Sequence, residues 1–527
     1  MTALDWTRGR HLHDVVRRAA ATAPHAPALI DGEHEITFAE LVDRVERAAA
    51  VVSSLTDPGA RVAVVGENHY SWVDAYYGVP RAGRLLVFGN HRLAASELRS
   101  VLERSGATVL LGPGAELDRI DPDPSVRRMT LEEWDAAIAA ADPAGAPPSP
   151  GDDAARDAAQ DAAQDAWIIF TSGTTGRSKG AVLTHASVLA AVRATDAHRH
   201  VAPDDVYLLP FPLAHIAGYN VVHHHAHRVP VVLMPRFEPA AFVTTVARHG
   251  VTSASLAATM LHALLAYLEA HPAQLANLAS LRLIAYGAAP MPTALLRRAH
   301  AVLGVDFTQG YGMTELSGNA VFLDVAAHRR GLAGDDVLLR SAGRPGRGVE
   351  LRVVDDADRP VPTGEAGEIV VRAEQVMDRY WDDEAATAEA LAGGWLHTGD
   401  IGRLDAGGYL TIVDRKKDVI VTGGENVSSL EVEQVLHTVA EVAEAAVVGV
   451  PDERWGENVC AIVVPRPGAT IDADAVVASV RSRLAGFKTP RHVVVVESLP
   501  KNATGKIVKA ELRAWLAEHP ELLGERR

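Results

Sequence analysis

The sequence of 527 residues contains a single cysteine, Cys460, so no disulfide can form within the chain. Chains without disulfides are typical of a reducing compartment, and we expect a cytoplasmic protein. Positive charge is also scarce, because 51 Lys and Arg residues stand against 67 Asp and Glu residues and give a formal net charge of −16. This balance disfavours binding to nucleic acid or to an anionic membrane, so local cations must meet any anionic ligand.

Long apolar segments are absent as well. No run of 18 apolar residues occurs, so the sequence predicts no transmembrane helix. Residues 1–8 contain no apolar core of the kind that secretory signals have, and we expect no such signal. What the chain does have is length and a hydrophobic content of 48%, which together indicate a globular protein with two or more domains.

Helical patterns alternate with short apolar strands over residues 14–111, and the alternation returns over residues 181–310. The predicted strands in these regions are residues 61–65, 108–111, 206–209, 229–234 and 281–285. Such alternation is typical of layered α/β structure. Residues 349–371 are rich in Val, Gly and Asp, and we expect them to form β-structure in a smaller subdomain.

A loop of small and hydroxyl residues, Thr-Ser-Gly-Thr-Thr-Gly-Arg-Ser-Lys-Gly, occupies residues 171–180 between two predicted strands. Gly173 and Gly176 permit the positive φ that a nest of backbone N–H groups needs, and Lys179 adds a cation. These features favour a polyphosphate ligand. The loop is not a Walker A motif, which requires four residues between its first Gly and its Gly-Lys pair. A surface linker is the alternative, but it leaves the lysine and the flanking strands unexplained.

Four further motifs follow in order along the chain. They are Tyr-Gly-Met-Thr-Glu at residues 311–315, Leu-His-Thr-Gly-Asp at 396–400, the segment 414–427 and Pro-Lys-Asn-Ala-Thr-Gly-Lys-Ile at 500–507. Together with the loop, they make the chain similar to the adenylate-forming superfamily of acyl-CoA synthetases, peptide-synthetase adenylation domains and luciferases. The resemblance implies a large layered α/β adenylation domain with a β subdomain over residues 1–414. It also implies a small mobile α/β domain over residues 415–527, with a hinge near Lys417.

The reaction that the resemblance implies is the ATP-dependent ligation of an acid to CoA. The carboxylate of a small-molecule acid, fatty or aromatic, attacks the α-phosphate of ATP and releases pyrophosphate, and the CoA thiol then displaces AMP. Two anions meet in the first step, so positioned cations, Mg²⁺ and backbone donors are needed. We therefore expect ATP, Mg²⁺ and CoA as cofactors, no nucleic acid partner, and a monomer or homodimer.

The resemblance also assigns roles to the residues around ATP. Those expected to wrap the β and γ phosphates are Thr171, Ser172, Gly173, Thr174, Thr175, Gly176 and Lys179. Thr314 is expected to contact the α-phosphate. Glu315 is expected to hold Mg²⁺, with Thr175 as a weaker ligand, because hard oxygen ligands suit a hard cation.

The nucleoside is expected to lie against residues from several motifs. They are Gly287, Ala288, Ala289, Pro290, Gly310, Tyr311, Gly312, Met313, Asp400, Ile412 and Arg415. Among them, Tyr311 would pack on adenine, and Asp400 would accept hydrogen bonds from the ribose hydroxyls with help from Arg415.

Catalysis and acyl binding are implied for further residues. Lys506 would bridge the carboxylate and the α-phosphate during adenylation, and it joins Thr314, Glu315 and His215 in the expected catalytic set. The expected acyl pocket consists of His215, Ile216, Ala217, Gly218 and Ser317, with His215 as its gate. Gly423 and Gly424 would give the pantetheine arm of CoA backbone clearance.

Two alternatives to this function remain open. One is the same adenylation with another acceptor, such as a carrier-protein thiol or an amine, or the activation of nitrite as in diazotase-type relatives. The other is a non-catalytic nucleotide-binding regulator. Intact Lys179, Glu315, Asp400 and Lys506 argue against the regulator, and the sequence does not identify the acid.

A histidine cluster stands outside these motifs. His223, His224, His225 and His227 follow the predicted acyl-pocket segment, and the spacing of His223 and His227 places both on one helical face, as in many metal sites. No carboxylate or thiol lies nearby in the sequence to complete such a site. The alternative is that the cluster shapes the acyl pocket. Cys460 is preceded by Gly-Glu-Asn-Val and followed by apolar residues, so it is expected to be a buried strand residue, not a nucleophile.

Overall fold

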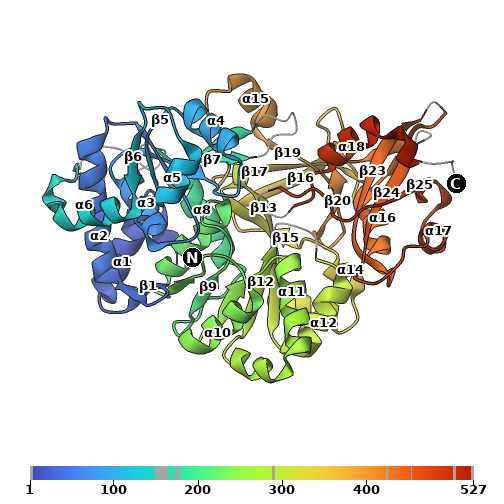
Figure 1. The fold of residues 1–527 in the computed structure, drawn as a ribbon, viewed down its shortest axis with the longest axis horizontal. Coiled ribbons are helices and arrows are strands. Elements are labelled where there is room, and N and C mark those ends of the chain that lie inside the picture. The colour runs from blue at the N-terminus through green and yellow to red at the C-terminus, as the bar shows by residue number, and fades with distance from the viewer. Residues whose placement is uncertain are drawn as a thin grey trace. The chain divides into compact units, whose positions relative to one another are not determined.

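The computed structural model describes residues 4–148, 164–171, 178–287, 291–422, 425–452, 454–502 and 506–523 (Figure 1). The chain packs as two compact units. Unit 1 comprises Met1–Glu350 and Val371–Leu396, and unit 2 comprises Leu351–Val370 and His397–Arg527. The predicted α/β class, with a large N-terminal part and a smaller C-terminal part, is confirmed. The domain boundary expected at residue 414 stays a prediction.

One sheet of unit 1 has seven strands. These are β3 (Arg61–Val65), β4 (Leu85–Gly89), β5 (Ala107–Gly112), β6 (Arg127–Thr130), β7 (Asp165–Thr171), β8 (Lys179–Thr184) and β18 (Arg379–Tyr380), in the order β18-β8-β7-β4-β3-β5-β6. The strands from β7 to β6 are parallel, and β8 runs antiparallel to both β7 and β18. The inner strands β3, β4, β5 and β7 are largely apolar, as strands covered on both faces require, whereas the edge strand β6 reads Arg-Arg-Met-Thr and is half exposed.

The second sheet of unit 1 has nine strands. These are β1 (Pro27–Asp31), β2 (His34–Thr37), β9 (Tyr207–Leu209), β10 (Val231–Leu233), β11 (Ser253–Ser255), β12 (Leu283–Gly287), β13 (Asp306–Met313), β14 (Gly318–Leu323) and β15 (Arg344–Pro345), in the order β15-β14-β13-β12-β11-β9-β10-β1-β2. The five strands predicted from the sequence are all present in the two sheets of unit 1, and their ends differ from the predicted ends by at most a few residues. For example, β12 begins after Leu281, whose N–H closes a turn onto Leu278.

Helices cover these sheets. In unit 1 they are α1 (Leu12–Thr22), α2 (Phe38–Leu55), α3 (Tyr70–Arg81), α4 (Ala95–Ser105), α5 (Gly114–Ile120), α6 (Leu131–Ala140), α8 (His185–Asp196), α9 (Tyr219–Ala226), α10 (Pro239–His249), α11 (Ala258–Ala270), α12 (Thr293–Leu303), α13 (Val325–Leu332), α14 (Asp336–Leu339) and α15 (Glu384–Ala390). Local capping signals begin several of these helices. For example, the Thr37 hydroxyl caps α2 by accepting a hydrogen bond from the N–H of Glu40, and the Glu40 carboxylate accepts one from the N–H of Thr37. Helix α8 is buried along most of its length and packs against β14 and α9.

Unit 2 contains two smaller sheets. The first consists of β16 (Val349–Val354), β17 (Gly367–Ala373), β19 (Leu396–Leu404) and β20 (Leu410–Arg415), which confirms the predicted β-structure near residues 349–371. The second consists of β21 (Ile420–Thr422), β22 (Glu425–Val427), β23 (Val442–Asp452), β24 (Gly456–Pro465) and β25 (His492–Val495). Its helices are α16 (Ser429–Leu436), α17 (Ala473–Arg481) and α18 (Lys509–Glu518).

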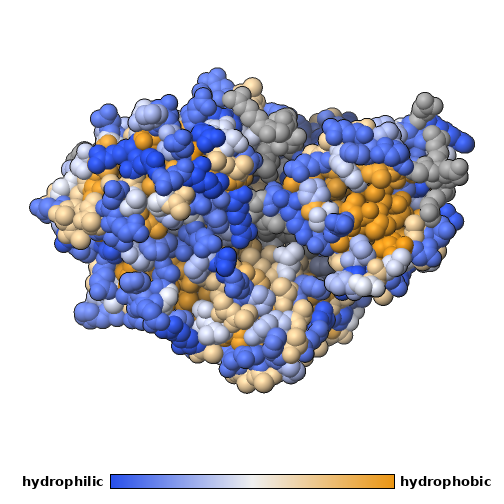
Figure 2. All heavy atoms as spheres, viewed as in Figure 1, coloured by the Kyte–Doolittle hydropathy of each residue, from blue (hydrophilic) through white to orange (hydrophobic). Residues whose placement is uncertain are grey.

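The core of unit 2 lies on both sides of its second sheet. Cys460 of β24 is fully buried there, and burial raises the pKa of its thiol to about 12, so its predicted place in a buried strand is confirmed. A hydrophobic area is visible on the surface of unit 2, and smaller hydrophobic areas interrupt the hydrophilic surface of unit 1 (Figure 2). None of the helices in the described part of the chain has the length and apolar character needed to cross a bilayer.

Candidate active site

The two ends of the predicted phosphate loop lie side by side in unit 1. Thr171 ends β7 and pairs with Lys179, the first residue of β8. The Thr171 hydroxyl lies 3.4 Å from the carbonyl of Lys179 and 3.4 Å from Oε1 of Glu315. The strands therefore bring a hydroxyl, a cation and a carboxylate to one edge of the sheet.

Several predicted residues fall outside the described part of the chain. They are Ser172, Gly173, Thr174, Thr175 and Gly176 of the loop, Ala288, Ala289 and Pro290 of the adenine-facing turn, and Gly423 and Gly424 of the CoA segment. Their roles stay predictions.

Glu315 lies in a short 3-10 helix, η6 (Thr314–Leu316), directly after β13. Tyr380 of β18 donates a hydrogen bond of 2.9 Å from its phenol to Oε1 of Glu315. The N–H of Trp381 donates to the carbonyl of Gly180, which fixes β18 beside the end of the loop. Burial, and then the negative charge of Glu315, raises the pKa of Tyr380, so the phenol keeps its proton and remains a donor.

Tyr380 also faces the predicted phosphate-binding lysine. The Nζ of Lys179 lies 5.1 Å from the centre of the Tyr380 ring, within the range of a cation–π contact. Thr171, Lys179, Glu315 and Tyr380 thus form one polar cluster. A hard carboxylate beside a fixed ammonium is a donor set suited to a magnesium-bound phosphate. Sequence reasoning missed Tyr380, since no motif surrounds it.

Three glycines allow the neighbouring strands β12, β13 and β14 to approach closely. A Cβ at Gly287 would lie 2.5 Å from the carbonyl oxygen of Gly310, and a Cβ at Gly310 would lie 2.2 Å from the Asn319 amide. A Cβ at Gly312 would lie 2.0 Å from the carbonyl oxygen of Gly318. Close packing between neighbouring strands therefore requires glycine at these three positions. Farther along β13 and η6 come the predicted nucleotide residues Tyr311, Met313 and Thr314, all half-buried.

His215 precedes the 3-10 helix η4 (Ile216–Gly218) and is half-buried. One ring nitrogen, Nε2, lies 3.4 Å from the Asn90 side-chain amide. Desolvation first, and then the positive charges of Arg92 and His91, lower the pKa of His215 to about 4. The imidazole is therefore neutral at neutral pH, as the wall of an apolar pocket requires.

Two other predicted pocket residues are tightly enclosed. A Cβ at Gly218 would lie 2.0 Å from the phenol oxygen of Tyr76, so no side chain fits there. Ser317 is fully buried with a φ of 52°, and its hydroxyl donates to the Ser187 hydroxyl at 2.9 Å. The Ser317 hydroxyl is thus engaged in a hydrogen bond to α8, which helps to pack this helix against the segment after β13.

Unit 2 carries the predicted ribose-binding pair. Asp400 of β19 and Arg415 of β20 face each other in register, with 2.7 Å between Arg415 Nε and Asp400 Oδ1. Asp400 is buried, and its N–H donates to the Thr398 hydroxyl. Ile412, also predicted to contact the nucleotide, lies on β20 opposite Gly402. Arginine therefore orients the carboxylate that is expected to meet the ribose.

Lys506 lies within electrostatic reach of this pair, inside unit 2. Desolvation and then the charge of Arg415 lower the pKa of Lys506 to about 8, against the opposing effect of Asp400. The residue as a whole is exposed. Its backbone N–H donates to the Asn502 side chain at 2.9 Å, which anchors the segment.

The predicted hinge residue, Lys417, is exposed just after β20. Residues on both sides of it are anchored within unit 2. Lys416 pairs with Glu368 at 3.0 Å, and Asp418 pairs with Arg513 of α18 at 2.8 Å. The backbone at Lys417 thus joins two well-anchored segments.

The histidine cluster proves to have the carboxylate that the sequence did not reveal. Asp196, at the end of α8, lies 2.6 Å from His227, and together with His223 these residues form a group of possible metal ligands. Asp196 is 27 positions before His223 in the sequence, so only the packing of α8 on α9 brings them together.

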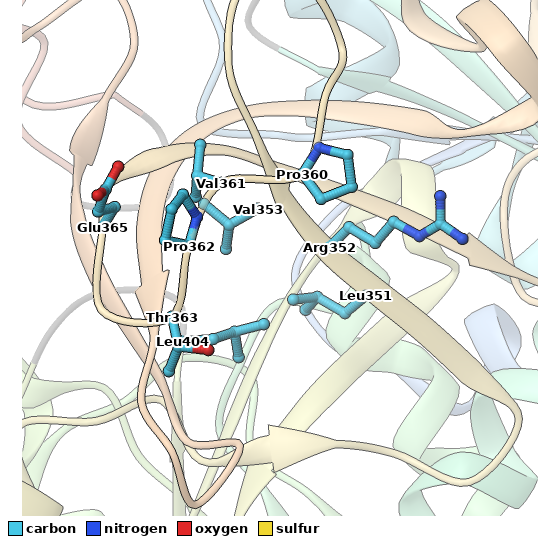
Figure 3. A pocket seen from close by; sticks show the side chains of 9 residues that line it. All are labelled: Leu351, Arg352, Val353, Pro360, Val361, Pro362, Thr363, Glu365 and Leu404. Carbon is cyan, nitrogen blue, oxygen red and sulfur yellow. The ribbon is translucent and has the colours of Figure 1, made fainter.

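A hollow on unit 2 lies apart from all of these residues (Figure 3). Its lining consists of Leu351, Arg352, Val353, Pro360, Val361, Pro362, Thr363, Glu365 and Leu404. The Arg352 guanidinium and the Glu365 carboxylate both point away from its centre (Figure 3). The hollow contains no predicted site residue and gathers no reactive groups.

Comparisons with known proteins point to one family. A family model described as AMP-binding enzyme matches residues 16–381, and one described as AMP-binding enzyme C-terminal domain matches residues 431–506. A feruloyl-CoA synthase from Amycolatopsis is 37% identical over 502 residues, covering 94% of this chain and 97% of that protein. An indoleacetate–CoA ligase from Aromatoleum aromaticum is 35% identical over 523 residues, covering 96% and 98%. The o-succinylbenzoate CoA synthetase from Bacillus subtilis, solved with its acyl-adenylate intermediate, matches with a TM-score of 0.82 at 30% identity, covering 95% and 97%.

Proposed function

The chain belongs to the AMP-binding enzyme family, and from that membership we infer that it is an ATP-dependent acid–CoA ligase. The observation that carries the inference is near full-length similarity to acid–CoA ligases together with the intact Thr171–Lys179–Glu315–Tyr380 cluster. A carboxylate oxygen attacks the α-phosphorus of ATP, the bond to the pyrophosphate oxygen breaks, and an acyl-adenylate forms. The thiolate of CoA then attacks the acyl carbon and releases AMP.

In the first step the polar cluster of unit 1 receives the triphosphate. Lys179 and the loop residues 171–176 bind the β and γ phosphates, and Thr314 contacts the α-phosphate. Glu315 holds Mg²⁺, which neutralises charge on the phosphates. Tyr380 keeps the Glu315 carboxylate oriented for this task, as supported by its 2.9 Å hydrogen bond.

In unit 2, Asp400 accepts from the ribose hydroxyls while Arg415 holds its carboxylate in place. Lys506 supplies the cation that draws the acid carboxylate to the α-phosphate. Residues 415–527 act as a domain that rotates about Lys417 between the two steps. In the second step, the backbone of Gly423 and Gly424 leaves clearance for the pantetheine arm of CoA. The single cysteine favours a reducing cytoplasm as the site of action, and the protein acts as a monomer or homodimer.

The acid is an aromatic carboxylic acid. The three relatives described above are named for feruloyl, indoleacetate and o-succinylbenzoate groups, each of which contains an aromatic ring. A neutral His215 suits an apolar group better than a charged one. A linear fatty acid of equal carbon number is the contrasting candidate.

ATP–pyrophosphate exchange with a panel of acids tests the first half of this function. The panel pairs cinnamates, arylacetates and benzoates with linear saturated acids of matching carbon number. We expect the highest kcat/KM for an aromatic acid. A higher value for the matched linear acid would overturn the aromatic assignment, and no exchange with any acid would overturn the ligase assignment.

Mass spectrometry of the products tests the acceptor. With ATP, Mg²⁺, the turned-over acid and CoA, we expect a CoA ester and AMP. The Gly424→Trp variant should release pyrophosphate but form no ester, because an indole fills the clearance that the pantetheine arm needs. Accumulation of acyl-AMP without any CoA ester in the unmodified protein would instead favour an amine or carrier-protein acceptor.

A further inference from the structure

Asp196 and His227 form a hydrogen-bonded contact between two helix ends. Asp196 is the last residue of α8, and His227 is the C-cap of α9. The distance between His227 Nε2 and Asp196 Oδ1 is 2.6 Å, and their side chains are 17% and 9% exposed. A carboxylate and an imidazole thus meet at a partly enclosed edge of unit 1.

His223 lies one helical turn before His227 and is fully buried. Neither of its ring nitrogens has a hydrogen-bond partner among the described residues. Burying an unpaired polar group costs about 1–3 kcal/mol, and native proteins leave few such groups. The ring centres of His223 and His227 lie 5.4 Å apart, so the unpaired His223 imidazole lies next to the Asp196–His227 contact.

The neighbouring histidines of α9 behave differently. His224 Nδ1 bonds the carbonyl of Asn220 at 2.7 Å, and its ring stacks on Tyr207. His225 uses both ring nitrogens, one with the Tyr77 phenol and one with the carbonyl of Ala28, each at 2.9 Å. Ordinary core histidines in this helix are therefore satisfied, and the unpaired state of His223 requires its own explanation.

We propose that Asp196, His223 and His227 bind a Zn²⁺ ion through one carboxylate oxygen and two imidazole nitrogens. One ligand atom from each residue lies within 4.8 Å of those of the other two. Zinc holds such ligands at about 2.0–2.2 Å, so small side-chain rotations close the set. Two histidines spaced by four on a helix form a common half of a zinc site, and a water molecule completes the tetrahedron.

An arginine and a carboxylate contribute charge at the site. The Arg199 guanidinium donates to Asn220 at 3.2 Å and lies over the Tyr207 ring, so its charge opposes the ion from the protein interior. The Asp196 carboxylate offsets that charge on the other side.

Zinc at this position would join the C-terminal ends of α8 and α9. Helix α9 continues directly from η4, which follows His215 and contains Gly218. The ion would therefore fix the helix on which the predicted acyl-pocket segment is mounted. This site does not depend on the proposed ligase function.

Zinc binding to the full-length protein tests the proposal. The chain is first freed of metal with a chelator and then titrated with Zn²⁺ against a chromogenic competitor, while the melting temperature is followed in parallel. We expect one tight ion per chain and a zinc-dependent rise in melting temperature. Asp196→Asn and His227→Gln should each weaken binding at least tenfold, and Co²⁺ should give tetrahedral visible bands that both variants lose.

Asp204→Asn and His200→Gln are the matched controls, because both residues are exposed and lie in the same segment after α8. Both controls should keep full zinc affinity. His223→Gln should also lose the ion, but if this buried variant fails to fold, the other two variants still decide. Equal zinc binding by all variants, or no tight ion in the unmodified protein, would overturn the proposal.

Discussion

Tyr380 donates a 2.9 Å hydrogen bond to the Glu315 carboxylate across a sequence separation of 65 residues. The two-residue strand β18 makes this possible, because its pairing with β8 carries Tyr380 to the end of the phosphate loop. The carboxylate that we assign to Mg²⁺ is thereby held by a residue from outside the motif to which it belongs.

The Tyr380→Phe variant should weaken the use of Mg²⁺. A hydrogen bond to a charged group contributes about 1.5–3 kcal/mol, so kcat/KM for pyrophosphate release should fall roughly ten- to hundred-fold. The Mg²⁺ concentration for half-maximal rate should rise in parallel. Tyr267→Phe, at a half-buried position on α11, is the control. An unchanged magnesium dependence would remove Tyr380 from the site.

Adenylation should lose its rate as pH rises through about 8. The pKa of Lys506 is lowered to about 8, and the positively charged form is the one that attracts two anions, so activity disappears when the ammonium loses its proton. The measurement is the pH profile of kcat/KM for pyrophosphate release. Lys506→Arg should move the alkaline limb to higher pH, and a limb at the same pH would assign it to another group.

Lys506→Ala should separate the half-reactions. Loss of the cation should slow pyrophosphate release by roughly 10²–10³-fold, while thioester formation from a supplied acyl-adenylate continues. Lys501→Ala, which removes a lysine paired with Glu444 in the same segment, should leave both steps intact. Equal loss in the two steps would contradict a role confined to adenylation.

The Lys417→Pro variant should show the opposite separation. Proline fixes φ and removes an N–H at the one residue where we expect the backbone to rotate. Pyrophosphate release should survive and CoA-ester formation should collapse, as followed by mass spectrometry of both products. Lys417→Ala, which leaves the backbone free, should support both steps, and normal ester formation by the proline variant would move the hinge elsewhere.

Acid should unfold the protein through buried histidines. Burial lowers the pKa of His185 and His13 well below 6.5, and the nearby charges of His11, Arg17 and Arg81 act in the same direction. Below about pH 6.5 these histidines therefore bind protons in the unfolded chain but not in the folded one, so the free energy of unfolding falls as the pH drops. Each such histidine removes about 1.4 kcal/mol per pH unit in this window.

The His185→Asn variant tests this cause. Asn keeps an acceptor for the N–H of Leu12, which donates to His185 Nδ1 at 3.1 Å, but it does not titrate. Denaturant unfolding at about pH 5 and about pH 7.5 should show a smaller acid-dependent loss of free energy in the variant than in the unmodified protein. His271→Asn, at an exposed position, should lose as much as the unmodified protein does.

Features that are set by neighbouring residues or by a family motif were predicted from the sequence, whereas contacts between distant segments were missed. Residues 61–65 coincide with β3 because a continuous apolar run specifies a covered strand locally. The expected partners Asp400 and Arg415 do meet, since a family motif contains each of them. Tyr380 and Asp196 were missed because neither lies in a patterned segment, and only β18 pairing and helix packing bring them to their partners. The hydrogen bond from the Ser317 hydroxyl to Ser187 could not be predicted either, because helix α8 is distant from Ser317 in the sequence.

The burial of Cys460 has a practical consequence for experiments on this protein. A thiol whose pKa is about 12 presents almost no thiolate to alkylating or disulfide reagents at neutral pH, and β24 shields it from them. Colorimetric thiol titration therefore counts free CoA alone during turnover, without a background from the enzyme. One cysteine can be introduced at His200 in unit 1 and a second at Arg481 in unit 2, because both positions are exposed. These two would be the only reactive thiols available for a pair of spin labels or fluorophores. The distance between such labels, followed through one catalytic cycle, would report domain rotation in the otherwise native sequence.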